Sequence, residues 1–214
     1  MIEIDRGEVR RYLGFKNGQT DESTEDLIDA CIAKLNEEAV PKSVFHAFDL
    51  ENPVGNVLKI EGLCITSANL AKNLKGCSCV YLMAATLGVG VDRLIARASA
   101  TEMSRAVVYQ AAAAAMIEAY CDEINEALCR EAGRENLYCR PRFSPGYGDF
   151  NIKHQMDFAR LLDTPRKIGL TVTEGMALAP SKSVTAIIGL SREKQPCHIK
   201  GCEVCDKTNC AFRR

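Results

Sequence analysis

The segment Arg140–Asp149 reads RPRFSPGYGD. It combines two prolines, two glycines, two arginines, two aromatic residues and a carboxylate in ten positions. Because proline lacks a backbone donor and glycine is costly to order, neither a helix nor a central strand accommodates this mixture. The Pro145-Gly146 pair predicts a tight turn with one left-handed residue. We therefore expect a shaped loop that could hold a small anion or zwitterion, the alternative being a rigid connector with solvated arginines.

A long helix is predicted before this loop, from Thr101 to about Gly133, because the stretch is rich in helix formers and lacks proline. The run of alanines at 111–115 would let another backbone or a flat ligand approach closely, but we favour tight core packing as its explanation. Three glutamates, Glu118, Glu123 and Glu126, fall in its second half; one of them could face a site, although most helix carboxylates are simply solvated.

The first hundred residues alternate between helical and strand-like patterns. Ser23 is expected to cap a helix, and the continuous apolar run 79–86 predicts a buried strand. The Gly88-x-Gly90 pair after that run is typical of a dinucleotide-binding turn, but the third glycine is replaced by Arg93, which favours a plain strand-to-helix turn. Cys77 and Cys79 are expected to share one strand face as packing residues. The other predicted elements are strands at 43–50 and 57–65 and a helix at 67–74 ending near Gly76.

After the loop, the pattern predicts a short helix at 152–162 and an antiparallel pair of strands at 167–173 and 183–190, joined by residues 174–182. Strands, then one long helix, then strands again indicate an α+β fold rather than a regular α/β alternation. We expect a twisted, mainly antiparallel sheet with a long central helix and flanking helices over residues 1–191, followed by a separate cysteine-rich tail at 192–214.

Composition excludes several classes of function. The chain has 214 residues, of which 47% are hydrophobic and 26% charged, and its net charge is −1. This balance gives no reason to expect nucleic-acid binding or attraction to a membrane surface. No apolar run is long enough to span a bilayer and the N-terminus lacks a signal-peptide core, so we expect a cytoplasmic protein.

Four of the eleven cysteines lie within fourteen residues of the tail, at Cys197, Cys202, Cys205 and Cys210. In a reducing compartment four close thiolates are typical of zinc or an iron–sulfur cluster such as 4Fe–4S. His198 could replace one of them. The spacing matches neither a standard zinc ribbon nor a standard ferredoxin, so the metal stays open, and a reduced tail without metal is the alternative.

Two further features carry a family resemblance. Arg142-Phe143-Ser144-Pro145-Gly146-Tyr147 resembles the Arg-x-x-x-Gly-Tyr motif of the S-adenosylmethionine-binding (AdoMet-binding) activation domain of cobalamin-dependent methionine synthase. The segment 170–176, followed by Pro180 and Ser183-Val184, is similar to that domain's Leu-Thr-Glu-Ser…Met…Pro…Ser-Val stretch. The order of the two motifs and the preceding helix agree as well, so the resemblance covers residues 101–190.

The resemblance implies AdoMet binding and the reductive methylation of an oxidised corrinoid, as part of methionine biosynthesis. Arg142 would pair with the AdoMet carboxylate. The Tyr147 ring would face the sulfonium or the adenine. Gly146 and Gly148 would allow close approach of the backbone, and Glu174 would bind the ammonium or the ribose. Ser144 and Pro145 complete the implied binding loop.

The length of the chain implies a methyltransferase-type component that acts in trans. Its partners would be a cobalamin-dependent methionine synthase or another corrinoid protein, and a small redox protein such as flavodoxin or ferredoxin. An iron–sulfur cluster in the tail would relay the electron, whereas zinc would form a structural clip or a docking element. A metal-binding electron-transfer or interaction module without AdoMet chemistry is the alternative function.

Overall fold

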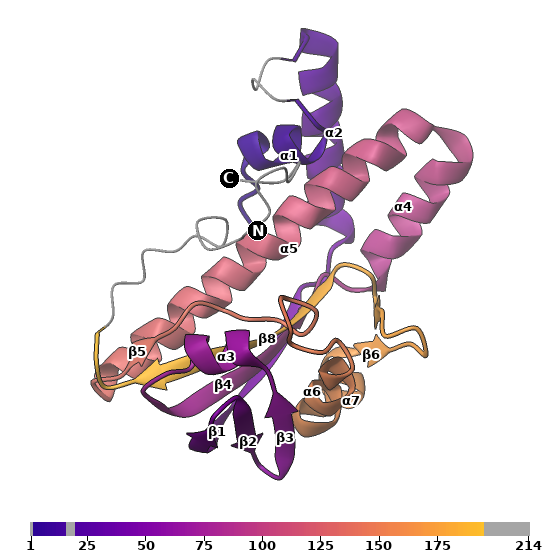
Figure 1. The fold of residues 1–214 in the computed structure, drawn as a ribbon. Helices are drawn as coiled ribbons and strands as arrows, with labels where there is room; N and C mark the ends of the chain where they lie inside the picture. Colours follow the sequence, from indigo (N-terminus) through magenta and orange to yellow (C-terminus); the bar gives the residue numbers. More distant parts are fainter. Residues whose placement is uncertain (1, 16–19, 195–214) are drawn as a thin grey trace.

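The computed structural model describes residues 2–15 and 20–194 and places a six-stranded sheet at the centre of the molecule (Figure 1). Every neighbouring pair in the sheet is antiparallel. The predicted α+β class, with a mainly antiparallel sheet and a long central helix, is therefore confirmed. The strands follow the spatial order β3 (Leu63–Thr66), β2 (Val57–Ile60), β1 (Lys42–Val54), β4 (Cys77–Thr86), β8 (Ser183–Ser191) and β5 (Tyr138–Cys139), and a separate hairpin joins β6 (Thr171–Val172) to β7 (Leu178–Ala179).

Helices cover both faces of the sheet. The longest, α5, runs along one face, and its N-terminal half extends past the sheet into a lobe with α1, α2 and α4 (Figure 1). The shorter helices α3, α6 and α7 pack on the opposite face. No helix in the described part of the chain is both long enough and apolar enough to cross a membrane. The bounds are α1 (Arg6–Tyr12), α2 (Glu22–Glu38), α3 (Ala68–Asn73), α4 (Val89–Thr101), α5 (Met103–Arg134), α6 (His154–Leu162) and α7 (Thr164–Ile168).

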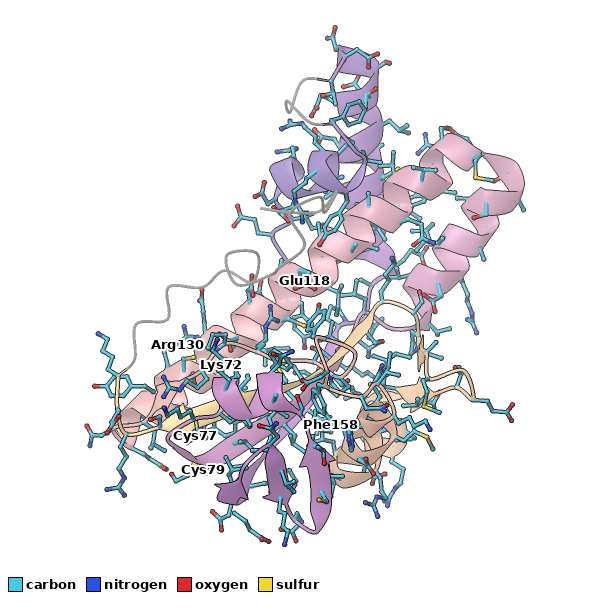
Figure 2. The ribbon with its side chains drawn as sticks, in the orientation of Figure 1. Lys72, Cys77, Cys79, Glu118, Arg130 and Phe158 are labelled. Atoms are coloured by element: carbon cyan, nitrogen blue, oxygen red, sulfur yellow. The ribbon has the colours of Figure 1, made fainter. Side chains whose placement is uncertain are left out.

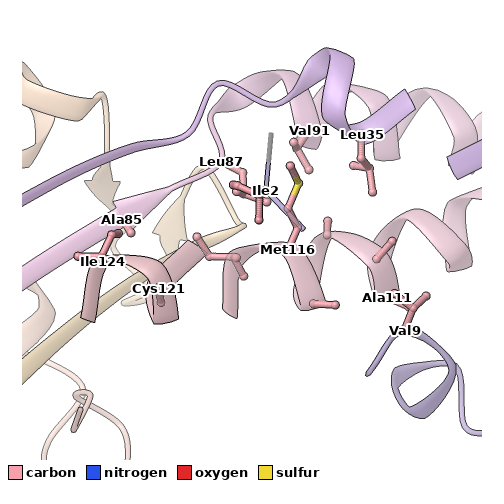
Figure 3. Close-up of a cluster of buried hydrophobic side chains, with 14 of the residues drawn as sticks. Ile2, Val9, Leu35, Ala85, Leu87, Val91, Ala111, Met116, Cys121 and Ile124 are labelled. Atoms are coloured by element: carbon pink, nitrogen blue, oxygen red, sulfur yellow. The ribbon is translucent and has the colours of Figure 1, made fainter. Parts of the chain in front are cut away.

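The central strand β4 is buried on both sides, which explains its continuous apolar run. Tyr81 and Met83 contribute to the core beneath α5, whereas Val80 and Leu82 contribute to the core beneath α3 and α6. The first core extends into the helical lobe, where Met116 of α5 meets side chains from α2 and α4 (Figure 3). A strand with two buried faces cannot show the polar alternation of a half-buried one.

The predicted common face for Cys77 and Cys79 is wrong. The pairing of β4 with β8 shifts between these two cysteines, where Cys77 opposes Ser191 and Cys79 opposes Leu190. This irregularity places one extra residue, Ser78, in β4 and turns the two thiols to opposite sides. Cys77 joins the core beneath α3, and Cys79 packs against the core beneath α5.

The glycines that follow β4 serve packing, in agreement with a plain strand-to-helix turn. Gly88 has φ +85° and precedes α4. A Cβ atom on Gly90 would lie 2.4 Å from the carbonyl oxygen of Glu38 at the end of α2. The close contact of α4 with α2 therefore requires glycine at this position. The long helix begins at Met103, after a break at Glu102, close to the predicted start.

Three other predicted elements need correction. The strand expected at 57–65 is a hairpin, because Glu61 and Gly62 both adopt positive φ and reverse the chain. Of the strand expected at 167–173, only β6 forms, and it pairs with β7 rather than with β8, whereas residues 167 and 168 belong to the end of α7. The N-cap of α2 is Asp21 instead of Ser23, since the Asp21 carboxylate accepts a hydrogen bond from the Thr24 amide.

Candidate functional site

The segment 140–143 extends the edge of the sheet alongside β8. The Arg140 amide donates to the Gly189 carbonyl at 2.7 Å, and Phe143 exchanges two backbone hydrogen bonds of 2.9 Å with Ile187. Phe143 packs into the core beneath α3 and α6. Because side chains alternate along extended backbone, the neighbouring Arg142 points the other way, towards α5.

The next residues form the predicted tight turn. The Tyr147 amide donates to the Ser144 carbonyl at 3.1 Å, and Gly146 has φ +97°, which confirms a left-handed residue after Pro145. The Gly146 amide then donates to the carbonyl of Phe150 at 2.8 Å. Phe150 is almost fully buried, so it anchors the far end of the turn in the core.

Asp149 fixes the same loop to the N-terminus of α3. Its carboxylate accepts hydrogen bonds from the Ser67 hydroxyl at 2.5 Å, the Ala68 amide at 2.6 Å and the Asn69 amide at 3.1 Å. These bonds, with that of Ser67 the largest cause, lower the pKa of Asp149. A Cβ atom on Gly148 would lie 2.2 Å from Nδ2 of Asn69, so any other residue at this position requires the Asn69 side chain to move.

An open hollow of about 290 Å³ lies between this loop, α5 and the start of β8. We call it the Arg142 hollow. It receives side chains from five elements of the fold that are distant in sequence. Its lining consists of Glu118, Arg142, Ser144, Pro145, Tyr147, Gln155, Leu178, Ser183, Val184 and Thr185.

Two carboxylates of α5 neutralise Arg142 in the absence of a ligand. The Nη2 atom of Arg142 lies 2.7 Å from Oδ1 of Asp122 and 3.4 Å from Oε2 of Glu118. The Arg142 side chain is 19% exposed, whereas Glu118 and Asp122 are 41% and 68% exposed. Figure 2 shows Glu118 near the middle of α5, on the stretch that passes the loop. The hollow therefore presents a largely buried cation next to two more accessible anions.

Two polar atoms at the hollow are buried and lack a hydrogen-bond partner among the described residues. One is Nη1 of Arg142, the second arm of its guanidinium, and the other is Oε1 of Gln155. The amide nitrogen of Gln155 donates to the Met176 carbonyl at 3.4 Å, which leaves the oxygen as the orphan atom. A missing donor–acceptor pair on a concave surface is the arrangement that a polar ligand completes.

Tyr147 adds an accessible aromatic surface. The residue is 60% exposed, and its ring forms a T-shaped pair with Phe143, with centroids 6.3 Å apart and an interplanar angle of 82°. Desolvation of its hydroxyl and the negative charge of Glu118 raise the pKa of Tyr147, so the phenol stays protonated near neutral pH.

The structure brings together some of the residues expected to bind a ligand and separates others. Arg142, Ser144, Pro145 and Tyr147 line the hollow. Gly146 and Gly148 shape the loop behind them. Glu174 lies exposed in the turn between β6 and β7, outside the lining, and its role stays a prediction.

Sequence reasoning missed Asp122 and Gln155, and it named Glu118 only as one of three glutamates of which one could face a site. The helical spacing of 118 and 122 is the signal that could have paired them on one face. The predicted ligand cysteines of the tail, 197, 202, 205 and 210, lie outside the described residues.

A second hollow, of about 370 Å³, lies beside β1 and is lined by His46, Asp49, Glu61 and Cys79 among others. These residue types are common metal ligands. Within residues 2–15 and 20–194, however, no three His, Cys, Asp or Glu side chains are grouped closely enough to hold a metal ion. We therefore assign this hollow no role.

Comparison with known proteins supports the fold assignment. No protein-family model and no curated protein matches the chain. Among solved structures, the crystal structure of the MetH reactivation domain bound to AdoHcy matches with a TM-score of 0.65 and 17% sequence identity, over 88% of this chain and 77% of that one. The chain therefore shares its fold with that reactivation domain.

Proposed function

We propose that the chain binds S-adenosylmethionine in the Arg142 hollow and supports the reductive methylation of a corrinoid held by a partner protein. The observation that carries this proposal is the orphan pair, Nη1 of Arg142 and Oε1 of Gln155. A buried polar atom without a partner costs about 1–3 kcal/mol. Two such atoms lie at the same hollow, an arrangement that is typical of a site completed by a polar ligand.

The charges of the hollow suit the amino-acid end of AdoMet. That end carries a carboxylate and an ammonium on the same carbon atom, so it requires a cation and an anion held close together. Arg142 and Glu118 meet this requirement, with Nη2 and Oε2 3.4 Å apart. The unpartnered Nη1 would donate to the ligand carboxylate in a charge-assisted hydrogen bond, and Glu118 would accept from the ammonium.

The apolar part of the lining suits the remainder of the ligand. The exposed ring of Tyr147 offers a π-face to the sulfonium cation, an interaction that is strongest when the cation is desolvated. Pro145 and Val184 offer flat or branched apolar surface for the adenine. The orphan Gln155 oxygen would accept a hydrogen bond from a donor on the ligand, such as a ribose hydroxyl.

When bound, AdoMet supplies an activated methyl group. One electron from a small redox protein would reduce the partner's cobalt. The methyl group would then pass to the metal as the carbon–sulfur bond breaks, leaving S-adenosylhomocysteine (AdoHcy). The chain's own residues bind and orient the ligand, and such positioning supplies a large share of the catalysis. The hollow is open, as it must be for a methyl group to reach a second protein.

Three exposed apolar side chains lie on the loop, on the short turn that follows it and on α6, close to the hollow. Tyr147, Ile152 and Met156 are 60%, 44% and 53% exposed. We assign them to contact with the corrinoid partner, a methionine synthase or another corrinoid methyltransferase of the cytoplasm. Flavodoxin or ferredoxin would deliver the electron, and the cysteine-rich tail would hold zinc or an iron–sulfur cluster.

Methyl transfer tests this function directly. AdoMet labelled in its methyl group would be incubated with the chain, a candidate corrinoid protein and a one-electron reductant under anaerobic conditions. Label on the corrinoid that requires both the chain and the reductant supports the proposal. Transfer at the same rate without the chain contradicts it. Competition by AdoHcy for the same step identifies the hollow's ligand class independently of the partner.

A further inference from the structure

Seven cysteines lie in the described part of the chain, and all of them are free thiols. Burial raises the pKa of the Cys31 and Cys77 thiols, and it raises the pKa of Cys121 to about 12. These three thiols are protonated and inert at neutral pH. Cys129 is only half-buried, and a hydrogen bond from Cys139 lowers its pKa.

The chain reversal after α5 brings these two cysteines together. Asn136 has φ +57°, and the Leu137 amide donates back to the Ala132 carbonyl at 3.0 Å, which closes the helix end. The chain then runs back as β5, where Cys139 pairs with Leu190 of β8. The thiol of Cys139 thereby reaches the sulfur of Cys129 on the last turns of α5.

The surroundings of the pair are polar and accessible. Both cysteines are half-buried, so a small reagent can reach them. Among the charged groups, Arg130 lowers the pKa of Cys129 and Glu126 raises it, and these two side chains pair with each other at 3.7 Å. Figure 2 shows Arg130 near the C-terminal end of α5. The hydrogen bond from Cys139 is the largest influence on the Cys129 thiolate.

We propose that Cys129 and Cys139 form a redox-active dithiol that exchanges with small-molecule disulfides and closes into a reversible intramolecular disulfide. The Cys129 thiolate attacks the reagent, forming a mixed disulfide and releasing one thiolate. Cys139 then loses its proton to solvent and attacks the Cys129 sulfur, which releases the second thiolate. The protein loses two electrons and the reagent gains them, so no other oxidant is needed.

The disulfide would tie the end of α5 to β5, with nine residues in the loop between the two sulfurs. Cys139 precedes Arg142 by three residues on the segment that extends along β8. This inference is independent of AdoMet binding, since it concerns a different pair of side chains and a different reagent.

The test uses the full-length reduced chain in buffers with increasing ratios of oxidised to reduced glutathione. Samples would be quenched in acid, alkylated and digested, and the disulfide-linked peptides would be mapped by mass spectrometry. We expect a Cys129–Cys139 linkage that forms at high ratios and disappears on return to reduced glutathione. Cys64→Ser, which removes an exposed thiol elsewhere, should leave the linkage unchanged.

A second measurement tests whether Cys129 and Cys139 act together or react as two independent thiols. In Cys139→Ala, which removes the donor, alkylation of Cys129 at neutral pH should slow about threefold for each unit by which its pKa rises, because nucleophilicity partly offsets the loss of thiolate. Glutathione should then stay attached to Cys129 as a mixed disulfide. An unchanged alkylation rate, or linkage of Cys129 or Cys139 mainly to other cysteines in the wild-type chain, would overturn the proposal.

Discussion

The Nη2 atom of Arg142 lies 2.7 Å from Oδ1 of Asp122, an ion pair that joins the loop 140–149 to the long helix α5. The aspartate is 68% exposed, whereas the arginine is 19% exposed. Asp122 therefore neutralises a cation that the proposed ligand would otherwise use. Any carboxylate that approaches Arg142 must either displace this aspartate or bind beside its negative charge.

Replacing that aspartate should strengthen ligand binding. In Asp122→Asn the competing charge is removed, while the amide oxygen can still accept from Nη2 and keep Arg142 in place. An exposed ion pair is worth about 0.2–1 kcal/mol, so AdoMet affinity should rise by up to about fivefold. Equilibrium titration measures it. The control is Glu123→Gln, which removes a negative charge one position along α5 and should leave the AdoMet affinity unchanged. Weaker binding in Asp122→Asn would contradict the prediction, because it would show that the aspartate assists the ligand.

Gln155 should show opposite effects on binding and stability. Its Oε1 is an orphan buried atom, and the only hydrogen bond described for its side chain is the 3.4 Å contact from Nε2 to the Met176 carbonyl. Gln155→Leu removes the unsatisfied acceptor, so the free energy of unfolding should stay the same or increase. AdoMet affinity should fall by about fivefold, the value of one ordinary hydrogen bond. Chemical denaturation and titration measure the two quantities, with Gln110→Leu on the exposed face of α5 as the control. An unaltered affinity would place the ligand away from Gln155.

The close approach of the loop to α3 predicts a pair of contrasting glycine variants. Gly148 has φ +55°, and a Cβ atom there would displace the side chain of Asn69. Gly148→Ala should lower the free energy of unfolding by about 1–2 kcal/mol, the cost of a left-handed alanine. Gly133 lies in α5, where an added Cβ atom would meet no other atom within 4 Å. Gly133→Ala should therefore raise the free energy of unfolding by about 0.5–1 kcal/mol. Equal effects of the two substitutions would argue against this loop geometry.

The ion pair between α1 and α2 predicts a pH dependence of stability. Hydrogen bonds from Arg10 and Thr20 lower the pKa of Glu25 from 4.5 to about 2. Because the folded state favours the ionised form, the stabilisation is complete above about pH 4.5 and disappears as the pH falls towards 2. The melting temperature of Glu25→Gln should therefore lie below that of the wild type at pH 7, and the gap should close over this range. Glu22→Gln is the control, and a gap that persists at pH 2 would exclude Glu25 as its origin.

Local sequence signals predicted the parts of the fold that depend on local physics. Residues 103–134 form a helix because their composition favours one, and the turn at Ser144–Tyr147 follows from the restricted φ of Pro145 and the freedom of Gly146. The buried strand β4 was predicted for the same reason, since an apolar run of that length indicates burial on both faces.

The errors arose where distant contacts or single residues decide the structure. Residues 164–168 form a helix that starts next to a left-handed Asp163, with Pro165 in its first turn, and five residues are too few to show a period. The bulge at Ser78 depends on pairing with β8, more than a hundred residues away. Glu118 reaches the site only because the loop after α5 folds back along β8, a contact that no local pattern encodes.

The most direct test of the central claim is a calorimetric titration of AdoMet into the anaerobically prepared chain, its Arg142→Ala variant and an Arg166→Ala control. Arg166 is highly exposed and pairs only with Asp163 among the described contacts, so it controls for the loss of a positive charge. We predict saturable binding to the wild type and the control, competition by AdoHcy, and a loss of more than about tenfold in Arg142→Ala, since a charge-assisted hydrogen bond is worth about 1.5–3 kcal/mol. Equal affinity of all three proteins, with Arg142→Ala folded by its thermal unfolding curve, would contradict the assignment of the hollow as the AdoMet site.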